Sequence, residues 1–352
     1  MKKYYLIFIF LQVHSLIFAQ KDTLIFSAYL ETYYTYDFGK NSEKPSYFCS
    51  YHRNNEINLN IGFLKVQYQS ERTRTNFAFM AGTYSNTNLA NEPGVLKNIF
   101  EANIGWKIAK QREIWLDAGV FPSHIGFESA IGKDCWNLTR SILADNSPYF
   151  ESGIRISYTN PQNNWFFAGL LLNGWQQIQR RDHIRTPAWG HQIVFTQSDY
   201  LLLNSSSFIG EVRSDSIKTI RFFHNFYGQL LLSKKANFTI GFDIGLQQKP
   251  TKNWIVWYSP VVIAQYKLHD RAKIALRGEY YRDKHQNIIQ VPSIEGFSTF
   301  SYSLNYDYWL APKILWRLEG RGFEGHEAIF KSYQNSFSKR AFWITTSLAI
   351  SF

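Results

Sequence analysis

The sequence predicts an all-β fold: a single transmembrane antiparallel β-barrel of about 16 strands, with short periplasmic turns and long extracellular loops. Segments in which apolar and polar residues alternate recur along the whole chain, as in strands with two unlike faces. The linkers between these segments alternate between short and long. The last segment, 342–352, has one apolar face and ends on Phe352, which is typical of the strand that closes such a barrel.

The first residues predict export. Residues 1–19 are expected to form a signal peptide, with two lysines, an apolar stretch and Ala19 at the expected cleavage point. The apolar stretch is short and interrupted by polar residues, which disfavours a membrane anchor. Residues 20–352 are expected to form one barrel domain in the outer membrane, because no later stretch is long enough to cross a membrane as a helix.

Each predicted strand sets apolar side chains against small or polar ones. In one of them, Ile104 and Trp106 oppose Gly105 and Lys107. The expected strands, in chain order, are 24–38, 57–68, 75–84, 100–108, 114–120, a segment around 154–158, 165–172, pairs that flank the turns at 198–199, 234–235, 269–271 and 311–313, and 342–352.

Long and short linkers alternate along the chain, so all the long linkers are expected at one end of the barrel and the short turns at the other. A β-sandwich or propeller gives no reason for linkers of two lengths on two sides. The longest linker, 122–149, carries several apolar residues, so it could either fold into the lumen and narrow it or cap the barrel from outside. The long linkers lie near 39–54, 85–97, 122–149, 176–189, 213–219, 284–296 and 324–340, with a shorter one near 250–253.

Charged residues within the strands fall on the face opposite the apolar one. Because charge is costly in lipid, we expect these side chains to point inward. They could line a water-filled pore or form a packed salt-bridge ladder, and a lumen of this width favours the pore because side chains alone would not fill it. Replacing Arg317 and Arg321 with Glu should then shift ion selectivity toward cations. The expected pore-lining residues are Glu31, Asp117, Arg155, Asp243, Arg277, Glu279, Asp307, Arg317, Glu319 and Arg321.

Enzyme signatures are absent from the sequence. It has no nucleophile elbow, zinc-protease motif or nucleotide-binding loop, and its nine histidines lack metal-ligand spacing. His224 lies on an apolar face, and we interpret it as an interfacial girdle residue near a strand end rather than a catalytic group. We therefore expect no enzyme activity, cofactor or metal.

The net charge of +11 does not indicate nucleic-acid binding, because the basic residues are spread over turns and loops. Attraction to the anionic headgroups of outer-membrane lipid, or a mild preference for anionic solutes, is the better interpretation. Cys49 and Cys135 both lie in predicted loops, and the sequence leaves open whether they form a disulfide.

Several segments, taken in order, resemble the OmpL-like putative beta-barrel porin-2 family of outer-membrane proteins. The resemblance implies a porin for passive diffusion of small hydrophilic solutes, and it carries over no binding residues. The alternatives are a closed, surface-exposed barrel with a binding or structural role, and a barrel enzyme. Expected partners are the barrel-assembly machinery, through the strand that ends at Phe352, and other copies in a homotrimer. The matching segments are 28–34, 101–105, 116–126, 147–153, 172–178, 276–281 and the closing strand.

Overall fold

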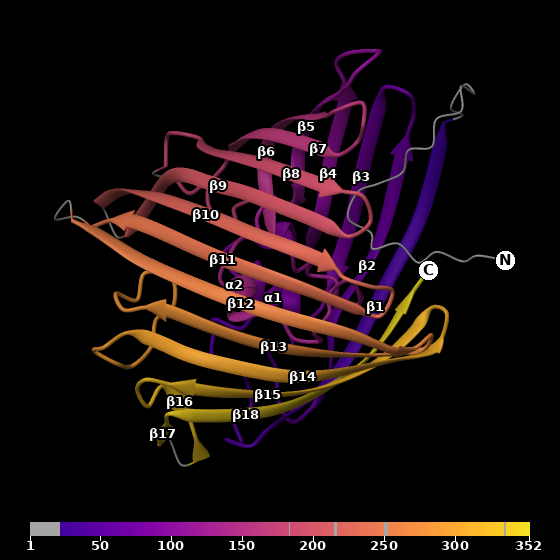
Figure 1. Cartoon of the computed structure of the whole chain (residues 1–352). Helices are drawn as coiled ribbons and strands as arrows, with labels where there is room; N and C mark the ends of the chain where they lie inside the picture. The colour runs from indigo at the N-terminus through magenta and orange to yellow at the C-terminus, as the bar shows by residue number, and fades with distance from the viewer. Residues whose placement is uncertain (1–21, 183, 215–216, 250–252, 334–335) are drawn as a thin grey trace.

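The computed structural model describes residues 22–182, 184–214, 217–249, 253–333 and 336–352, and within them sixteen strands close into one antiparallel barrel (Figure 1). The predicted signal peptide lies outside the described residues. The barrel strands are β1 (Thr23–Asp37), β2 (Ile57–Gln69), β3 (Thr73–Ala81), β4 (Ile99–Lys107), β5 (Glu113–Pro122), β6 (Phe150–Thr159), β7 (Trp165–Leu172), β8 (Ala188–Gln197), β9 (Leu201–Ser214), β10 (Ile217–Leu231), β11 (Ala236–Gln248), β12 (Trp254–His269), β13 (Ala272–Asp283), β14 (Phe297–Ala311), β15 (Ile314–Gly325) and β18 (Arg340–Ser351).

Each strand pairs with its neighbours in the sequence, and β18 closes the barrel against β1 with Leu30 opposite Ile350. The remaining elements lie in the linkers. They are the helices α1 (Thr83–Asn88) and α2 (Ile142–Asp145), the 3-10 turns η1 (Gly94–Asn98) and η2 (Gly132–Asp134), and the small hairpin of β16 (Phe330–Lys331) and β17 (Phe337–Ser338). No helix among the described residues is long and apolar enough to cross a membrane.

The two faces of the closing strand differ as predicted. Leu348 and Ile344 project outward and are exposed, whereas Thr345 and Ser347 on the other face are buried inside the barrel. An apolar exterior and a polar interior are the arrangement expected of a barrel in lipid.

Linkers of two lengths separate the strands, as expected. Both described ends lie at the short-turn end, where the Ser351 amide donates to the Lys313 carbonyl (3.1 Å) and Thr23 pairs with Gln69. The predicted long linker at 213–219 is wrong, because β9 continues to Ser214 and β10 begins at Ile217. Residues 213–214 and 217–219 belong to strand ends rather than to a loop.

The third strand ends earlier than predicted, at Ala81. Gly82 turns the chain into α1 with a φ of 139°, and a Cβ there would overlap the carbonyl oxygen of Asn60. Such a backbone conformation and such a close approach both require glycine.

Candidate functional site: the barrel interior

The longest linker, residues 123–149, which we call the lumen segment, runs through the interior of the barrel (Figure 1). Near its start, the His124 ring donates to the Ser207 carbonyl on β9 (2.8 Å), and the Gly126 amide donates to Asn225 Oδ1 on β10 (3.1 Å). Further along, α2 lies beside β12 and β13. Of the two expected positions for this linker, the structure therefore has the one inside the lumen.

Arg317 of β15 joins the lumen segment to the wall. Its guanidinium donates to Asp307 of β14 through Nε (2.6 Å) and Nη2 (3.0 Å). The same group donates to three carbonyls of the lumen segment, those of Gly132 (2.5 Å), Cys135 (2.9 Å) and Trp136 (3.2 Å). This buried guanidinium thus donates both to a carboxylate of the wall and to carbonyls of the lumen segment. A buried charge is stable only when it has such hydrogen-bond partners.

Arg277 of β13 forms a second bridge of the same kind. It donates to Glu319 Oε1 on β15 (3.1 Å) and to the Thr139 carbonyl in the lumen segment (2.6 Å). The Thr139 amide donates in turn to Glu319 Oε2 (2.5 Å). The wall carboxylate and the wall arginine therefore bind the donor and the acceptor of the same peptide segment.

Arg321 of β15 forms a third bridge of the same kind, with the next residues of the lumen segment. It donates to Glu279 Oε1 on β13 (2.7 Å) and to the Arg140 carbonyl (2.7 Å). The Ile142 amide donates to Glu279 Oε2 (2.6 Å). We call these three bridges, centred on Arg277, Arg317 and Arg321, the latch.

The lumen segment also stabilises its own shape. The buried guanidinium of Arg140 donates to the carbonyls of Ser129 (2.5 Å), Leu138 (2.6 Å) and Ala130 (3.2 Å). Gly132 lies so close to Glu31 of β1 that a Cβ would overlap the carboxylate. The segment therefore packs against β1 as well as against β13–β15.

The wall made by β2–β6 is less covered. Asp117 of β5 pairs with Arg74 of β3 (2.6 Å) and Arg155 of β6 (3.1 Å), and Lys65 of β2 pairs with Glu101 of β4 (2.5 Å). The side chains of Arg74 and Lys65 are each 19% exposed and that of Arg155 is 14% exposed, whereas that of Arg277 in the latch is 0% exposed.

The ten residues predicted to line the pore all lie on the inner face, where nine are buried and Arg155 is partly exposed. Asp243 accepts a hydrogen bond from Asn225, and Glu31 accepts from Tyr51 and Asn60. Six of the ten are the latch arginines and the carboxylates that pair with them. These six are Arg277, Glu279, Asp307, Arg317, Glu319 and Arg321. That the ten residues line a pore stays a prediction.

Two cations of the β2–β6 wall, Lys65 and Arg74, are absent from the residues predicted to line the pore. Lys65 lies within the expected strand 57–68, whereas Arg74 lies one residue before the expected strand 75–84 and belongs to β3 in the structure. Gly105 is the signal that could have revealed Arg74: it pairs with Arg74 across the strands, and a Cβ at Gly105 would overlap Asp117 Oδ1.

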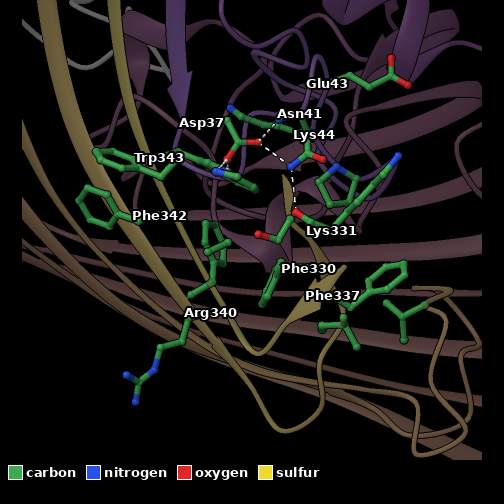
Figure 2. Close-up of a pocket in the computed structure, with 18 of the residues that line it drawn as sticks. Asp37, Asn41, Glu43, Lys44, Phe330, Lys331, Phe337, Arg340, Phe342 and Trp343 are labelled. Atoms are coloured by element: carbon green, nitrogen blue, oxygen red, sulfur yellow. Dashed lines mark hydrogen bonds between the residues drawn. The ribbon is translucent and has the colours of Figure 1, made fainter. Parts of the chain in front are cut away.

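A cavity of about 1260 Å³ opens at the loop end of the barrel, beside the seam between β1 and β18 (Figure 2). Its lining includes Asp37, Lys44, Phe330, Arg340 and Trp343, which come from the first linker, the β16–β17 region and the barrel wall. It is separate from the latch and combines basic side chains with aromatic rings.

Burial shifts the pKa values of two groups near this cavity. The pKa of Asp145 in α2 is raised to about 7 by burial, and that of Lys44 is lowered to about 7 by burial and by the nearby Arg321. Burial also raises the pKa of Glu128, although Arg277 and Ser141 oppose this shift. The lumen segment therefore contains carboxyl groups that hold their protons more tightly than in water.

The outer face of β8–β10 carries a polar patch amid apolar side chains. His191 of β8 and Ser207 of β9 form a hydrogen bond (2.5 Å), and Ser205 of β9 and His224 of β10 form another (3.3 Å). The interpretation of His224 as a girdle residue near a strand end is wrong, because it lies at the middle of β10 and its ring is 6.0 Å from that of His191. We call these four residues the outer polar patch.

No metal site is found in the described parts of the chain, where no three His, Cys, Asp or Glu residues are grouped to hold an ion. Cys49 and Cys135 are free thiols. Burial raises the pKa of the Cys135 thiol to about 11, so it is not a reactive thiolate at neutral pH.

A family model described as "Putative beta-barrel porin-2, OmpL-like" matches residues 23–352. The chain belongs to this family. Curated protein sequences give no match. The family and the barrel establish an outer-membrane protein with a porin-like channel fold, and they point to a channel rather than an enzyme.

Solved structures with the same fold include outer-membrane channels of low sequence identity. An anion-selective porin from Comamonas acidovorans is 8% identical, covers 94% of this chain and 100% of its own, and has a TM-score of 0.64. The channel DcaP of Acinetobacter baumannii is 8% identical over 95% and 99%, with a TM-score of 0.62. The trimer form of OmpT from Vibrio cholerae is 10% identical over 94% and 99%, with a TM-score of 0.59.

Proposed function

We propose that this porin-family barrel conducts small hydrophilic solutes by passive diffusion, along the space between the lumen segment and the β2–β6 wall. The observation that carries the proposal is the unequal cover of the two walls. The side chains of Lys65, Arg74 and Arg155 keep part of their surface exposed on the inner face, whereas the arginines of the latch are buried.

The β2–β6 wall would select solutes by charge as well as by size. Lys65, Arg74 and Arg155 share two carboxylates there, Glu101 and Asp117, and the cations are 14–19% exposed whereas the carboxylates are 8% and 1% exposed. Fixed charges beside a water-filled path favour ions of opposite sign. We therefore propose a mild preference for anionic solutes, in the same direction as the anion-selective porin from Comamonas acidovorans.

Single-channel recording of the refolded mature chain in a planar bilayer tests this function. Stable current steps in the nanosiemens range are expected, with a reversal potential in a salt gradient that favours anions. Thermal or urea unfolding of the same preparation is the control for correct folding. No current from a folded barrel would contradict the proposal.

That silent outcome would favour the second candidate, a closed barrel with a binding or structural role. The observation that supports it is the latch, which fixes the lumen segment to β13–β15 through buried ion pairs. Either function leaves the solute chemically unchanged, so we propose that the chain is not an enzyme. A hydrolysis assay with the refolded barrel would contradict this if one Ser or His substitution abolished turnover.

We also propose that residues 1–19 are removed on export and that the barrel-assembly machinery recognises β18. Mass spectrometry of the protein from outer membranes should give a chain that begins at Gln20. Deleting Phe352 should reduce the amount of barrel in the membrane, while a deletion in the linker 284–296 should not.

A homotrimer that forms through the outer polar patch is the assembly we propose, and OmpT of Vibrio cholerae, which has a similar fold, also has a trimer form. Polar side chains that face lipid at mid-barrel depth are costly unless they meet protein. Ser205 and Ser207 are small, so another barrel can approach closely there. His191→Leu with His224→Leu should dissociate the assembly in light scattering of detergent-purified protein, whereas Thr75→Leu on the outer face of β3 should not.

A further inference from the structure

We propose that the cavity at the loop end, beside the seam of β1 and β18, binds an anion that carries an aromatic or other apolar ring. The proposal goes beyond conduction and does not depend on it, because a ligand can bind there whether or not the lumen conducts. It rests on the balance of charge in the cavity and on the nature of its walls (Figure 2).

The carboxylate of Asp37 is already fully engaged. It accepts hydrogen bonds from the amides of Gly39 (2.8 Å) and Asn41 (2.9 Å), from the Asn41 side chain (2.7 Å) and from the Trp343 indole (3.1 Å). Asp37 lines the cavity, but its carboxylate oxygens already accept four hydrogen bonds and have little capacity left to bind a cation.

The other two carboxylates of the lining also have partners. Glu324 pairs with Arg340 (2.8 Å), and Glu43 pairs with Arg53 (3.4 Å), which is outside the lining. Ion pairs at the rim weaken the negative field that these groups would otherwise project into the cavity.

Lys44 is different, because it is a buried cation without an anionic partner. It is only 4% exposed, and its ammonium forms no ion pair or side-chain hydrogen bond with the described residues. The groups around it are rings: Nζ lies 5.1 Å from the ring centre of Trp343 and 5.8 Å from that of Tyr51. A buried ammonium in this state gains free energy when an anion reaches it.

Aromatic side chains surround this cation. Phe323 packs against Trp343 (4.5 Å between ring centres) and Phe330 (5.6 Å), and all three line the cavity. Ring faces and edges of this kind bind flat apolar groups by stacking and edge contacts. The site thus combines a buried, unpaired lysine with an aromatic wall, which matches a ring carboxylate better than inorganic phosphate.

Lys44 also predicts how binding depends on pH. Burial and Arg321 of β15 lower its pKa to about 7, against the opposing charges of Asp145 in the lumen segment, Glu319 of β15 and Asp37 of β1. Lys44 loses its proton as the pH rises through this value, and Asp145 becomes charged over the same range. Both changes weaken the binding of an anion above neutral pH.

Isothermal titration calorimetry of the refolded full chain tests the proposal with three probes: benzoate, phosphate and benzyl alcohol. At pH 6 we expect saturable binding of benzoate, and at least about tenfold weaker binding of phosphate, which lacks the ring, and of benzyl alcohol, which lacks the charge. Benzoate binding should weaken at pH 9. Equal affinity for benzoate and phosphate, or no saturable binding of benzoate, would overturn the proposal.

Two lysine variants locate the site. Lys44→Met should weaken benzoate binding by about tenfold or more, because a charged hydrogen bond is lost. Lys284→Met, on the linker after β13 and exposed outside the cavity lining, is the matched control and should change the affinity less than about twofold. If Lys44→Met does not fold, the pH dependence of the wild type and Trp343→Leu test the same site. Unchanged binding in Lys44→Met would refute the assignment, while the conductance of the ligand-free protein separately tests the channel.

Discussion

The two walls of this barrel use the same residue types in different ways. On the β13–β15 side, arginines and carboxylates form ion pairs that are buried beneath the lumen segment and bind its peptide groups. On the β2–β6 side, Arg74, Asp117 and Arg155 also form ion pairs, but no peptide group of the lumen segment is bound to them and the cations keep part of their exposure.

This difference shows that an inward charge in a barrel can have a structural or a solute-facing role, depending on what covers it. A buried ion pair depends on both partners, since either one alone is an uncompensated charge in a medium of low polarity. A partly hydrated pair contributes little to stability, but its field reaches the solvent. Mutations on the two walls should therefore affect different measurements.

The largest expected effect is on stability. Arg317→Met leaves Asp307 with Asn305 as its remaining side-chain hydrogen-bond partner and removes a donor from three peptide carbonyls, so it should lower the free energy of unfolding by about 3–5 kcal/mol. Arg74→Met should cost about 1 kcal/mol, because Asp117 keeps Arg155. Urea unfolding of both variants in lipid vesicles measures the difference, and equal losses would show that the latch is no more structural than the other wall.

The lumen segment should also make stability depend on pH. The folded-state pKa of Asp145, about 7, exceeds its ordinary value, so the folded barrel keeps a proton that the unfolded chain has released, and stability falls between about pH 4 and pH 7. Lys44 acts oppositely: its lowered pKa makes stability rise from about pH 7 to pH 10. Asp145→Asn should remove a decrease on the order of 3 kcal/mol from the acid side of the profile. An unchanged profile would mean that Asp145 is already charged in the folded barrel.

Weakening the latch without removing its side chains should release the lumen segment. Glu279→Gln with Glu319→Gln keeps the shape of both acceptors of the Ile142 and Thr139 amides but removes their charge. A loss of about 2 kcal/mol would raise the ratio of released to latched segment by about thirtyfold. Single-channel recordings should then show larger or more frequent conducting states.

Glu101→Gln on the β2–β6 wall is the control for this pair, since its carboxylate binds Lys65 and no part of the lumen segment. If the control changed the conductance as much as the double variant does, the latch would not be what holds the segment.

Much of the barrel could be predicted because alternation along each strand reports which face meets lipid. The expected segment 165–172 coincides with β7, and the turns at 234–235 and 269–271 lie where the strands reverse. The failure at 213–219 has a physical cause: strand ends that pass beyond the lipid need no apolar face, so their alternation is lost.

The interior could be predicted only in part. The strand pattern shows which side chains point into the barrel, but it does not show which of them another part of the chain covers. Side chains alone would not fill so wide a lumen, but here a segment of backbone occupies it. The groups of the lumen segment that the wall arginines bind, such as the carbonyls of Gly132 and Thr139, belong to the backbone, so no residue type in the sequence marks them. Lys44 escaped prediction because its environment comes from Trp343, almost 300 residues away in the chain.

The smallest expected effect is on ion selectivity, and it distinguishes the β2–β6 wall from the β13–β15 wall most directly. A unit charge about 8 Å from a permeating ion stabilises an anion and destabilises a cation by about 0.5 kcal/mol each in water, so Arg155→Gln should lower the anion-to-cation permeability ratio by up to about fivefold. Arg321→Gln should change this ratio less, because that side chain is 2% exposed beneath the lumen segment. Reversal potentials in a salt gradient measure both. The opposite order, with Arg321 controlling selectivity, would place the conducting path along β13–β15, as the sequence alone had predicted for Arg317 and Arg321.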